Sequence, residues 1–328
     1  MRKLAFYLCI VLQFVALAYM AGNREYIRAY GDEVWLPTAP IDPRDPFRGD
    51  FVRLQYAINH VPAPQSLQAE DFMLKGTVVY ARLREAARGT FEFSELSLDP
   101  PSRGTFLKGR VTGQQLWRGT HINVNYGIEQ LFVQQGRGRE IEARRGSRTE
   151  LQVPLEVLVA VGGDGTGVIK DYRWGALGAR LEIVRSNRRD PSGVLQSPGF
   201  PPSPKLRFTL ANVSAGSLSI IESADQCQFV VVPAFDPAYP PLSTPQRCGA
   251  GFDSVVRSLA PGEEAAYEID LALPAWQVRI GDEHGELGVL IDNWNEMYRL
   301  VYRPIADGRD VWQGQLPSRA FNMAGRID

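Results

Sequence analysis

The pattern of apolar and polar residues divides the chain into one apolar N-terminal run and a long remainder of short, alternating segments. After Met1, the cations Arg2 and Lys3 precede an uncharged run over residues 4–21, which gives way to Gly-Asn-Arg-Glu at residues 22–25. As a helix, this run is roughly 27 Å long, close to the lower limit for crossing a hydrocarbon core of about 30 Å. The pattern predicts a membrane-spanning or export segment over residues 1–22.

The apolar run has two interpretations, a retained membrane anchor and a cleaved signal peptide. Two cations before it and none within it place the N-terminus in the cytoplasm and the bulk of the chain outside. A cleaved signal peptide is the alternative, because residues 16–18 (Ala-Leu-Ala) offer small residues in an A-x-A arrangement. Since the apolar character continues through residues 19–21, we favour a retained, single-pass anchor in the cytoplasmic (inner) membrane. In both cases the bulk lies on the extracytoplasmic, periplasmic side.

Downstream of this run, helical periodicity is scarce. Short alternating or β-branched runs recur between clusters of Gly, Pro, Asn and Asp, which is typical of antiparallel sheets. Within residues 51–58, Val52, Leu54, Tyr56 and Ile58 share one face and predict a half-buried strand. Further strands are predicted around residues 77–83, 104–111, 123–132, 151–161 and 167–172. The predicted fold class is all-β, and these strands form a compact β domain over residues 23–177.

A second group of strands follows this domain. Strands are predicted at residues 179–184, 205–210, 218–221, 228–232, 265–271, 297–302 and 311–316. A Pro-rich connection at residues 191–204 interrupts them, because proline excludes regular strand pairing there. Roughly seven short strands separated by turn signals favour an immunoglobulin-like β-sandwich over residues 178–328. Such a sandwich hosts unrelated functions and therefore indicates no activity.

Composition narrows the class of protein but names no ligand. A length of 328 residues favours two domains, and 44% apolar with 22% charged residues argues against both disorder and a multi-spanning membrane protein. With 36 basic and 37 acidic residues, the formal charge of -1 provides no field that attracts nucleic acid. We therefore expect no nucleic-acid partner.

The three cysteines have different settings. Cys9 lies within the apolar run, whereas Cys227 and Cys248 lie far downstream and close together. In an oxidising compartment these two would pair and close a loop of roughly twenty residues, contributing about 3 kcal/mol. In a reducing cytosol they would remain thiols. Because we expect export, we predict a disulfide between Cys227 and Cys248.

Catalytic and metal-binding signatures are absent from the sequence. Two cysteines with the scattered His60, His121 and His284 do not supply four metal ligands at matched spacings. There is no Gly-x-Ser-x-Gly elbow, and the histidines carry no catalytic motif. We expect no metal, no cofactor and no enzymatic activity.

One short string matches a nucleotide-binding motif in sequence. Residues 162–166 (Gly-Gly-Asp-Gly-Thr) match the phosphate-binding turn of diacylglycerol, sphingosine and NAD kinases. A phosphate cradle of that kind needs a strand that leads into a helix, but strand-like segments lie on both sides of this string. The context predicts a hairpin loop. ATP is also not normally available outside the membrane.

Three ordered stretches resemble one bacterial family. Residues 42–56 (DPRDPFRGDFVRLQY) resemble the signature of the GDYXXLXY family, a group of membrane-anchored proteins. Residues 108–111 and 126–140 are similar to the same family, and so is a retained N-terminal helix. The resemblance covers about the first 175 residues, and Phe51 stands where the family name has Tyr. It implies a topology and a domain type but no reaction, because the family's activity is unassigned.

The motif has two interpretations. In the favoured one it is a strand-entry corner, in which Gly49 allows the turn and Asp50 accepts backbone N–H groups. In the other it forms an interaction surface, since charged loops beside a rigid strand often bind partners. The motif residues are Asp42, Arg44, Asp45, Arg48, Gly49, Asp50, Phe51, Leu54, Tyr56, Tyr126, Gly127 and Glu129.

These observations favour an extracytoplasmic binding or scaffold protein. We expect it to engage a protein partner at or in the cytoplasmic membrane and to contact the membrane through its N-terminal helix. The alternatives are a cell-envelope enzyme with an unrecognised site and a protease-inhibitor-like sandwich with one protruding loop. A deep pocket with converging titratable groups would favour the enzyme, whereas an apolar patch or an open sheet edge would favour binding.

Overall fold

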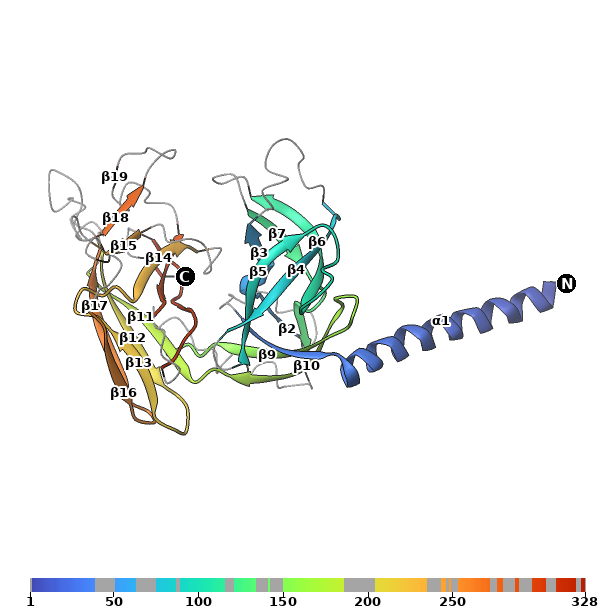
Figure 1. Ribbon diagram of the computed structural model, residues 1–328, viewed down its shortest axis with the longest axis horizontal. Coiled ribbons are helices and arrows are strands. Elements are labelled where there is room, and N and C mark those ends of the chain that lie inside the picture. Colours follow the sequence, from blue (N-terminus) through green and yellow to red (C-terminus); the bar gives the residue numbers. More distant parts are fainter. Residues whose placement is uncertain are drawn as a thin grey trace, which may run out of the picture.

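The computed structural model contains one long N-terminal helix, and the elements described after it are β-strands apart from one 3-10 turn (Figure 1). It describes residues 2–38, 51–62, 75–86, 89–115, 121–133, 141, 150–185, 204–234, 243–245, 248, 253–271, 276–279, 287–288, 297–304, 311–322 and 326–327. Every pair of neighbouring strands within its sheets is antiparallel. The mostly β character that the sequence predicts is confirmed.

Helix α1 (Arg2–Tyr30) contains the predicted apolar run. Its segment Phe6–Tyr30 is long and apolar enough to cross a membrane, and its most apolar window is not buried within the protein. The helix continues past the predicted anchor segment of residues 1–22 and ends at Tyr30. Arg24 and Glu25, which end the apolar run, are good helix formers and extend the helix beyond the uncharged region.

Backbones approach closely where α1 ends. The Gly31 N–H donates to the Ile27 carbonyl at 2.7 Å. A Cβ atom at Gly31 would lie 2.6 Å from the Ile27 carbonyl oxygen and 2.8 Å from that of Val161. Ile27 itself is buried, and a Cβ at Gly162 would lie 3.0 Å from its Cγ1. The helix is therefore docked onto a β-hairpin, and only glycine fits at the junction.

Three sheets form the first β unit, which lies next to α1 in Figure 1. One has the order β1 (Asp32–Pro37), β9 (Leu155–Val161), β10 (Gly167–Trp174). A second pairs β2 (Phe51–Arg53) with β8 (Gln130–Phe132). The third has the order β3 (His60–Pro62), β7 (His121–Asn125), β6 (Phe106–Gln115), β4 (Val78–Glu85), β5 (Phe91–Ser97). One hydrophobic core drawn from residues 34–161 joins them.

The predicted strand over residues 51–58 is only partly correct. Val52, Leu54, Tyr56 and Ile58 are all buried, as the alternation predicts. The ladder nevertheless ends at Arg53, and residues Ala57–Asn59 form a 3-10 turn, η1. The reason is local, because the Asn59 side-chain oxygen accepts the Tyr56 N–H at 2.6 Å and tightens the chain into this turn.

The predicted strand over residues 123–132 is likewise divided in two. Strand β7 ends at Asn125 and β8 begins at Gln130. Between them Gly127 adopts a φ of 79°, a left-handed conformation that glycine accepts without strain. The segment is therefore a turn between two strands that belong to different sheets.

The Gly-Gly-Asp-Gly-Thr string is a hairpin loop, as predicted. It joins the antiparallel strands β9 and β10. The Gly162 N–H donates to the Thr166 carbonyl at 2.9 Å, and the Asp164 carboxylate accepts the Thr166 N–H and hydroxyl. Strand β10, and not a helix, follows the loop, so the strand-to-helix context of a phosphate cradle is missing.

The second β unit also contains three sheets. The first is β11 (Leu177–Arg185), β12 (Lys205–Asn212), β17 (Glu264–Asp270), and the second is β13 (Leu218–Glu222) with β16 (Val255–Leu259). The third runs β19 (Leu287–Gly288), β18 (Trp276–Arg279), β15 (Ser243–Pro245), β14 (Phe229–Pro233), β20 (Met297–Tyr302), β21 (Leu316–Pro317), and β22 (Phe321–Asn322) also pairs with β20. Their shared core is drawn from residues 177–321.

The predicted last strand, residues 311–316, is wrong for most of its length. Residues 311–315 have no strand pairing, and β21 begins only at Leu316. Val311 and Trp312 are buried, so their apolar character reflects the core and not a ladder.

The two β units meet where Gln152 and Ala179 exchange backbone hydrogen bonds of 2.8 Å in both directions.

The predicted disulfide is present. Cys227 and Cys248 are bonded, with their Cα atoms 5.4 Å apart. Cys227 is buried two residues before β14, and Cys9 is an exposed free cysteine on α1. The bond therefore ties the chain beyond β15 back to the buried strand β14.

Reduction of this bond should lower the stability of the second β unit by about 3 kcal/mol, because it releases a loop constraint on the unfolded chain. The measurement is thermal unfolding with and without reductant in a Cys9→Ala background, in which the bridge supplies the only thiols. Identical melting in both conditions would contradict a stabilising role.

Candidate functional site at the end of the N-terminal helix

Two buried tyrosines interlock the segments that resemble the family motifs. The Tyr56 hydroxyl donates to the Ile128 carbonyl at 2.9 Å, and the Tyr126 hydroxyl donates to the Ile58 carbonyl at 2.9 Å. Each tyrosine thus bonds to the backbone of the segment that carries the other. The two segments are about 70 residues apart in sequence, and these bonds hold them side by side.

Glu129 completes this interlock. Its carboxylate accepts the N–H of Tyr126 at 2.7 Å, the N–H of Gly127 at 2.9 Å and the Asn59 amide at 2.9 Å. Its own carbonyl accepts the N–H of Leu54 at 2.9 Å. All these donors belong to the turn or to the neighbouring segment, so the carboxylate stabilises the turn before β8.

Leu54, Tyr56 and Tyr126 lie inside the protein. Burial, helped by the Glu129 carboxylate, holds the pKa of Tyr126 well above its usual value of 10.0, so its hydroxyl stays a hydrogen-bond donor. Gly109 makes room for this ring, because a Cβ there would lie 2.8 Å from Tyr126 Cδ1. These side chains organise the fold and are not presented to a partner on the surface.

Most of the other motif residues lie outside the part of the chain that the structure describes. Asp42, Arg44, Asp45, Arg48, Gly49 and Asp50 lie outside the described residues. Phe51 is described by its backbone, which pairs with Phe132 in the β2–β8 ladder. A surface role for the charged part of the motif stays a prediction.

A groove of about 680 Å³ lies between the end of α1 and the first β unit. One wall is Arg24 and Arg28 of α1, a second is strand β8, and a third is the start of β10. The turn before β8 forms its base. The lining residues are Arg24, Arg28, Asn125, Gly127, Glu129, Gln130, Leu131, Phe132, Gly167, Val168, Ile169 and Lys170.

The lining of the groove contains more cations than carboxylates. Its lining contains three cations, Arg24, Arg28 and Lys170, and one carboxylate, Glu129. Lys170 pairs with Glu33 at 2.6 Å and Arg28 with Glu25 at 3.5 Å, whereas Arg24 has no ion pair within the described part of the chain. Because Glu129 already accepts three N–H groups and the other two cations have carboxylate partners, Arg24 is the charge most available to a ligand, and it is cationic.

The groove does not have the composition of a metal site. Within the described ranges, no group of three or more His, Cys, Asp or Glu side chains could hold a metal ion.

Gly127 and Glu129 are the two groove residues that the sequence singled out through the family resemblance. The cations were not singled out, since Arg24 and Arg28 become groove residues only because α1 extends to Tyr30.

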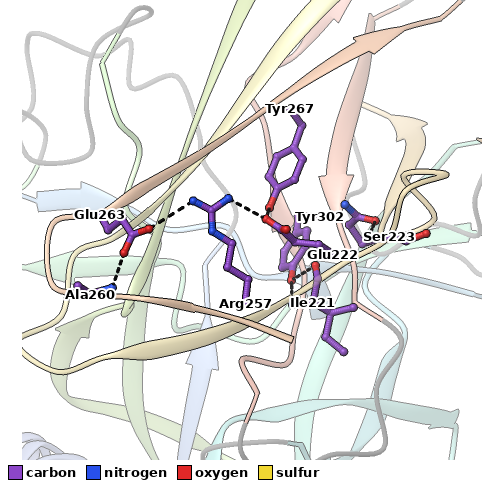
Figure 2. Close-up of polar contacts among 9 residues, drawn as sticks. Ile221, Glu222, Ser223, Arg257, Ala260, Glu263, Tyr267 and Tyr302 are labelled. Carbon is purple, nitrogen blue, oxygen red and sulfur yellow. Dashed lines mark hydrogen bonds and ion pairs between the residues drawn. The ribbon is translucent and has the colours of Figure 1, made fainter. Parts of the chain in front are cut away.

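A second polar cluster connects the sheets of the second β unit (Figure 2). The Tyr267 hydroxyl of β17 and the Arg257 guanidinium of β16 both donate to one Glu222 oxygen of β13, at 2.6 and 3.1 Å. The Tyr302 hydroxyl of β20 donates to the Ile221 carbonyl at 3.0 Å. Burial and the Glu222 hydrogen bond hold the pKa of Tyr267 far above its usual value. Each group finds its partner within the protein, so the cluster stabilises the packing of the sheets.

Comparison with known proteins bears on the N-terminal half of the chain. Residues 13–171 match the family model described as GDYXXLXY protein, which supports the resemblance seen in the three motifs. The match includes α1 from residue 13 onward and all three sheets of the first β unit except the last residues of β10. No curated protein and no solved structure matches the chain.

Tyr56→Phe and Tyr126→Phe should each destabilise the protein by about 1–3 kcal/mol, because each leaves a buried carbonyl without its donor. The matched control is Tyr80→Phe, since the Tyr80 hydroxyl makes no hydrogen bond in the described part of the chain and its ring packs against Phe106. Chemical denaturation measures all three. Equal stability of the three variants would contradict the interlock.

Proposed function

We propose that the chain is a membrane-anchored, extracytoplasmic binding or scaffold protein without enzymatic activity or cofactor, and that its first β unit engages a protein partner at the cytoplasmic membrane. The observation that carries the proposal is the groove between the candidate membrane helix and the β-sheet. A docking site at that junction suits a partner that is itself held in or at the membrane.

The position of the aromatic and basic residues of α1 supports this location. If α1 spans the membrane with its N-terminus in the cytoplasm, residues 24–30 lie at the outer membrane–water boundary. Tyr26 and Tyr30 are 65% and 77% exposed, which suits the interfacial belt where tyrosine is enriched. Arg24 and Arg28 then lie near the headgroups, and the groove opens close to the bilayer.

The chemistry of the groove supports binding over catalysis. Its only carboxylate among the lining residues accepts three N–H groups of the surrounding turn. A general acid or base has to exchange protons with a substrate, and a carboxylate held in this way is suited to supporting the backbone. The groove therefore favours the binding role.

For the second half, residues 178–328, we propose an immunoglobulin-like sandwich that extends the binding surface. Strands β12, β14 and β20 contribute Phe208, Phe229 and Tyr302 to one core, with ring centroids 5.1 and 5.7 Å apart across Phe229. Two layers with interleaved aromatic side chains are what a sandwich requires. The division into residues 1–22, 23–177 and 178–328 belongs to the same proposal, with the anchor helix itself extended to Tyr30.

The proposal predicts a site-specific crosslink in native membranes. A photo-crosslinking amino acid at Gln130, in the groove, should yield a discrete adduct with a membrane-associated protein, identified by mass spectrometry. The control position is Val255, which is 65% exposed on β16 in the second β unit. Protease added to spheroplasts should also digest both β units.

Two results would contradict the proposal. One is the same set of adducts from Gln130 and Val255, which would indicate random collision. The other is full protection of the β units from external protease, which would place the bulk of the chain on the cytoplasmic side.

A further inference from the structure

Strand β10 has an open edge in the groove. It lies at the end of its sheet and pairs only with β9 among the described strands. The Gly162 N–H bonds to the Thr166 carbonyl, and hydrogen-bonded pairs alternate along an antiparallel ladder. Val168 is therefore hydrogen-bonded to Ala160, whereas Gly167 and Ile169 direct their N–H and C=O groups away from β9.

Strand β8, on the opposite wall of the groove, also has one residue whose main-chain groups point away from its partner strand. The Leu54 N–H bonds to the Glu129 carbonyl, so the next hydrogen-bonded pair of the β2–β8 ladder is Val52 with Leu131. Gln130 then directs its main-chain groups away from β2. Gln130, Gly167 and Ile169 all line the groove, so two strands contribute to it residues whose main-chain groups their own ladders do not use.

The side chains define the kind of strand that fits. The lining includes the apolar residues Leu131, Val168 and Ile169. Arg24 and Arg28 are four residues apart on α1, so they lie on one face of the helix, and both line the groove. Apolar contacts beside cations suit an extended segment in which apolar residues alternate with carboxylates.

We infer that the groove binds an extended acidic segment of a membrane-associated protein, which adds as a strand to the open edge of β10. This inference rests on the proposed function and specifies its partner. Main-chain hydrogen bonds from Gly167 and Ile169 supply the pairing, as in other cases of strand addition. Arg24 and Arg28 select the charge of the incoming segment.

The test uses the full chain in phosphatidylcholine nanodiscs and labelled ten-residue peptides. One peptide alternates Val with Glu, and its control alternates Val with Lys. Fluorescence anisotropy should show that the acidic peptide binds about tenfold or more tightly than the basic one. The double variant Arg24→Glu/Arg28→Glu should remove this preference, whereas Arg24→Lys/Arg28→Lys should largely keep it.

A proline at the open edge tests strand addition itself. Ile169→Pro removes an N–H that β9 does not use, and proline is tolerated at such edge positions. It should weaken binding of the acidic peptide roughly tenfold, through the lost hydrogen bond and the bulk of the ring, while Ile169→Val binds normally. If Ile169→Pro proves unfolded by circular dichroism, the arginine variants, which lie outside the sheet, decide the outcome.

Equal binding of the acidic and basic peptides, or unchanged affinity in folded Ile169→Pro, would overturn the inference. So would binding of nanodiscs to anionic vesicles that the Arg24→Glu/Arg28→Glu variant loses, in the absence of peptide binding, since the groove would then be a headgroup site. A discrete protein crosslink from Gln130 without peptide binding would leave the proposed function standing and reject only strand addition.

Discussion

The reciprocal hydrogen bonds of Tyr56 and Tyr126 are the interaction on which the first β unit depends. Each hydroxyl satisfies a carbonyl of the other segment that would otherwise be buried without a donor, at a cost of about 1–3 kcal/mol. The pair fixes the turn that contains Gly127 and Glu129, and this turn sets where β8 begins. Because β8 is one wall of the groove, the groove's shape follows from two side chains inside the core.

The second constraint is the junction between α1 and the β9–β10 hairpin. Ile27 packs against Gly162, and Gly31 lies so close to Val161 that no side chain fits. The last turns of the helix are therefore docked on the same hairpin whose second strand forms the open edge. Helix α1, with Arg24 and Arg28, and the β10 edge form one connected unit, so any rotation of the helix moves these two cations relative to β10.

Local patterns predicted those features that depend on neighbouring residues in sequence. The burial of Val52, Leu54, Tyr56 and Ile58 and the hairpin at residues 162–166 follow from periodicity and turn chemistry. The pairing of Cys227 with Cys248 followed from the expected compartment and the lack of another partner. Tyr126 and Glu129 were singled out only by family resemblance, which named these residues and Tyr56 but not their bonds.

Features that depend on tertiary contacts were not predictable in this way. Residue 31, directly after α1, has to be glycine because the Val161 backbone, 130 residues away, leaves no room for a side chain. The split between β7 and β8 reflects Glu129 bonding to Asn59, and the groove exists only when α1, β8 and β10 meet. Sequence periodicity contains no information on contacts between elements that are distant in sequence.

The central claim is that the turn before β8, which contains Gly127 and Glu129, is rigid. The neighbouring edge of β10 has no strand partner among the described residues. Amide hydrogen exchange of the full chain in nanodiscs, resolved by residue, measures both properties at once. The account predicts slow exchange at Leu54, Tyr126 and Val168, whose N–H groups are bonded within the fold, and fast exchange at Gly167 and Ile169. Fast exchange at Leu54 and Tyr126, or equally slow exchange along all of β10, would contradict it.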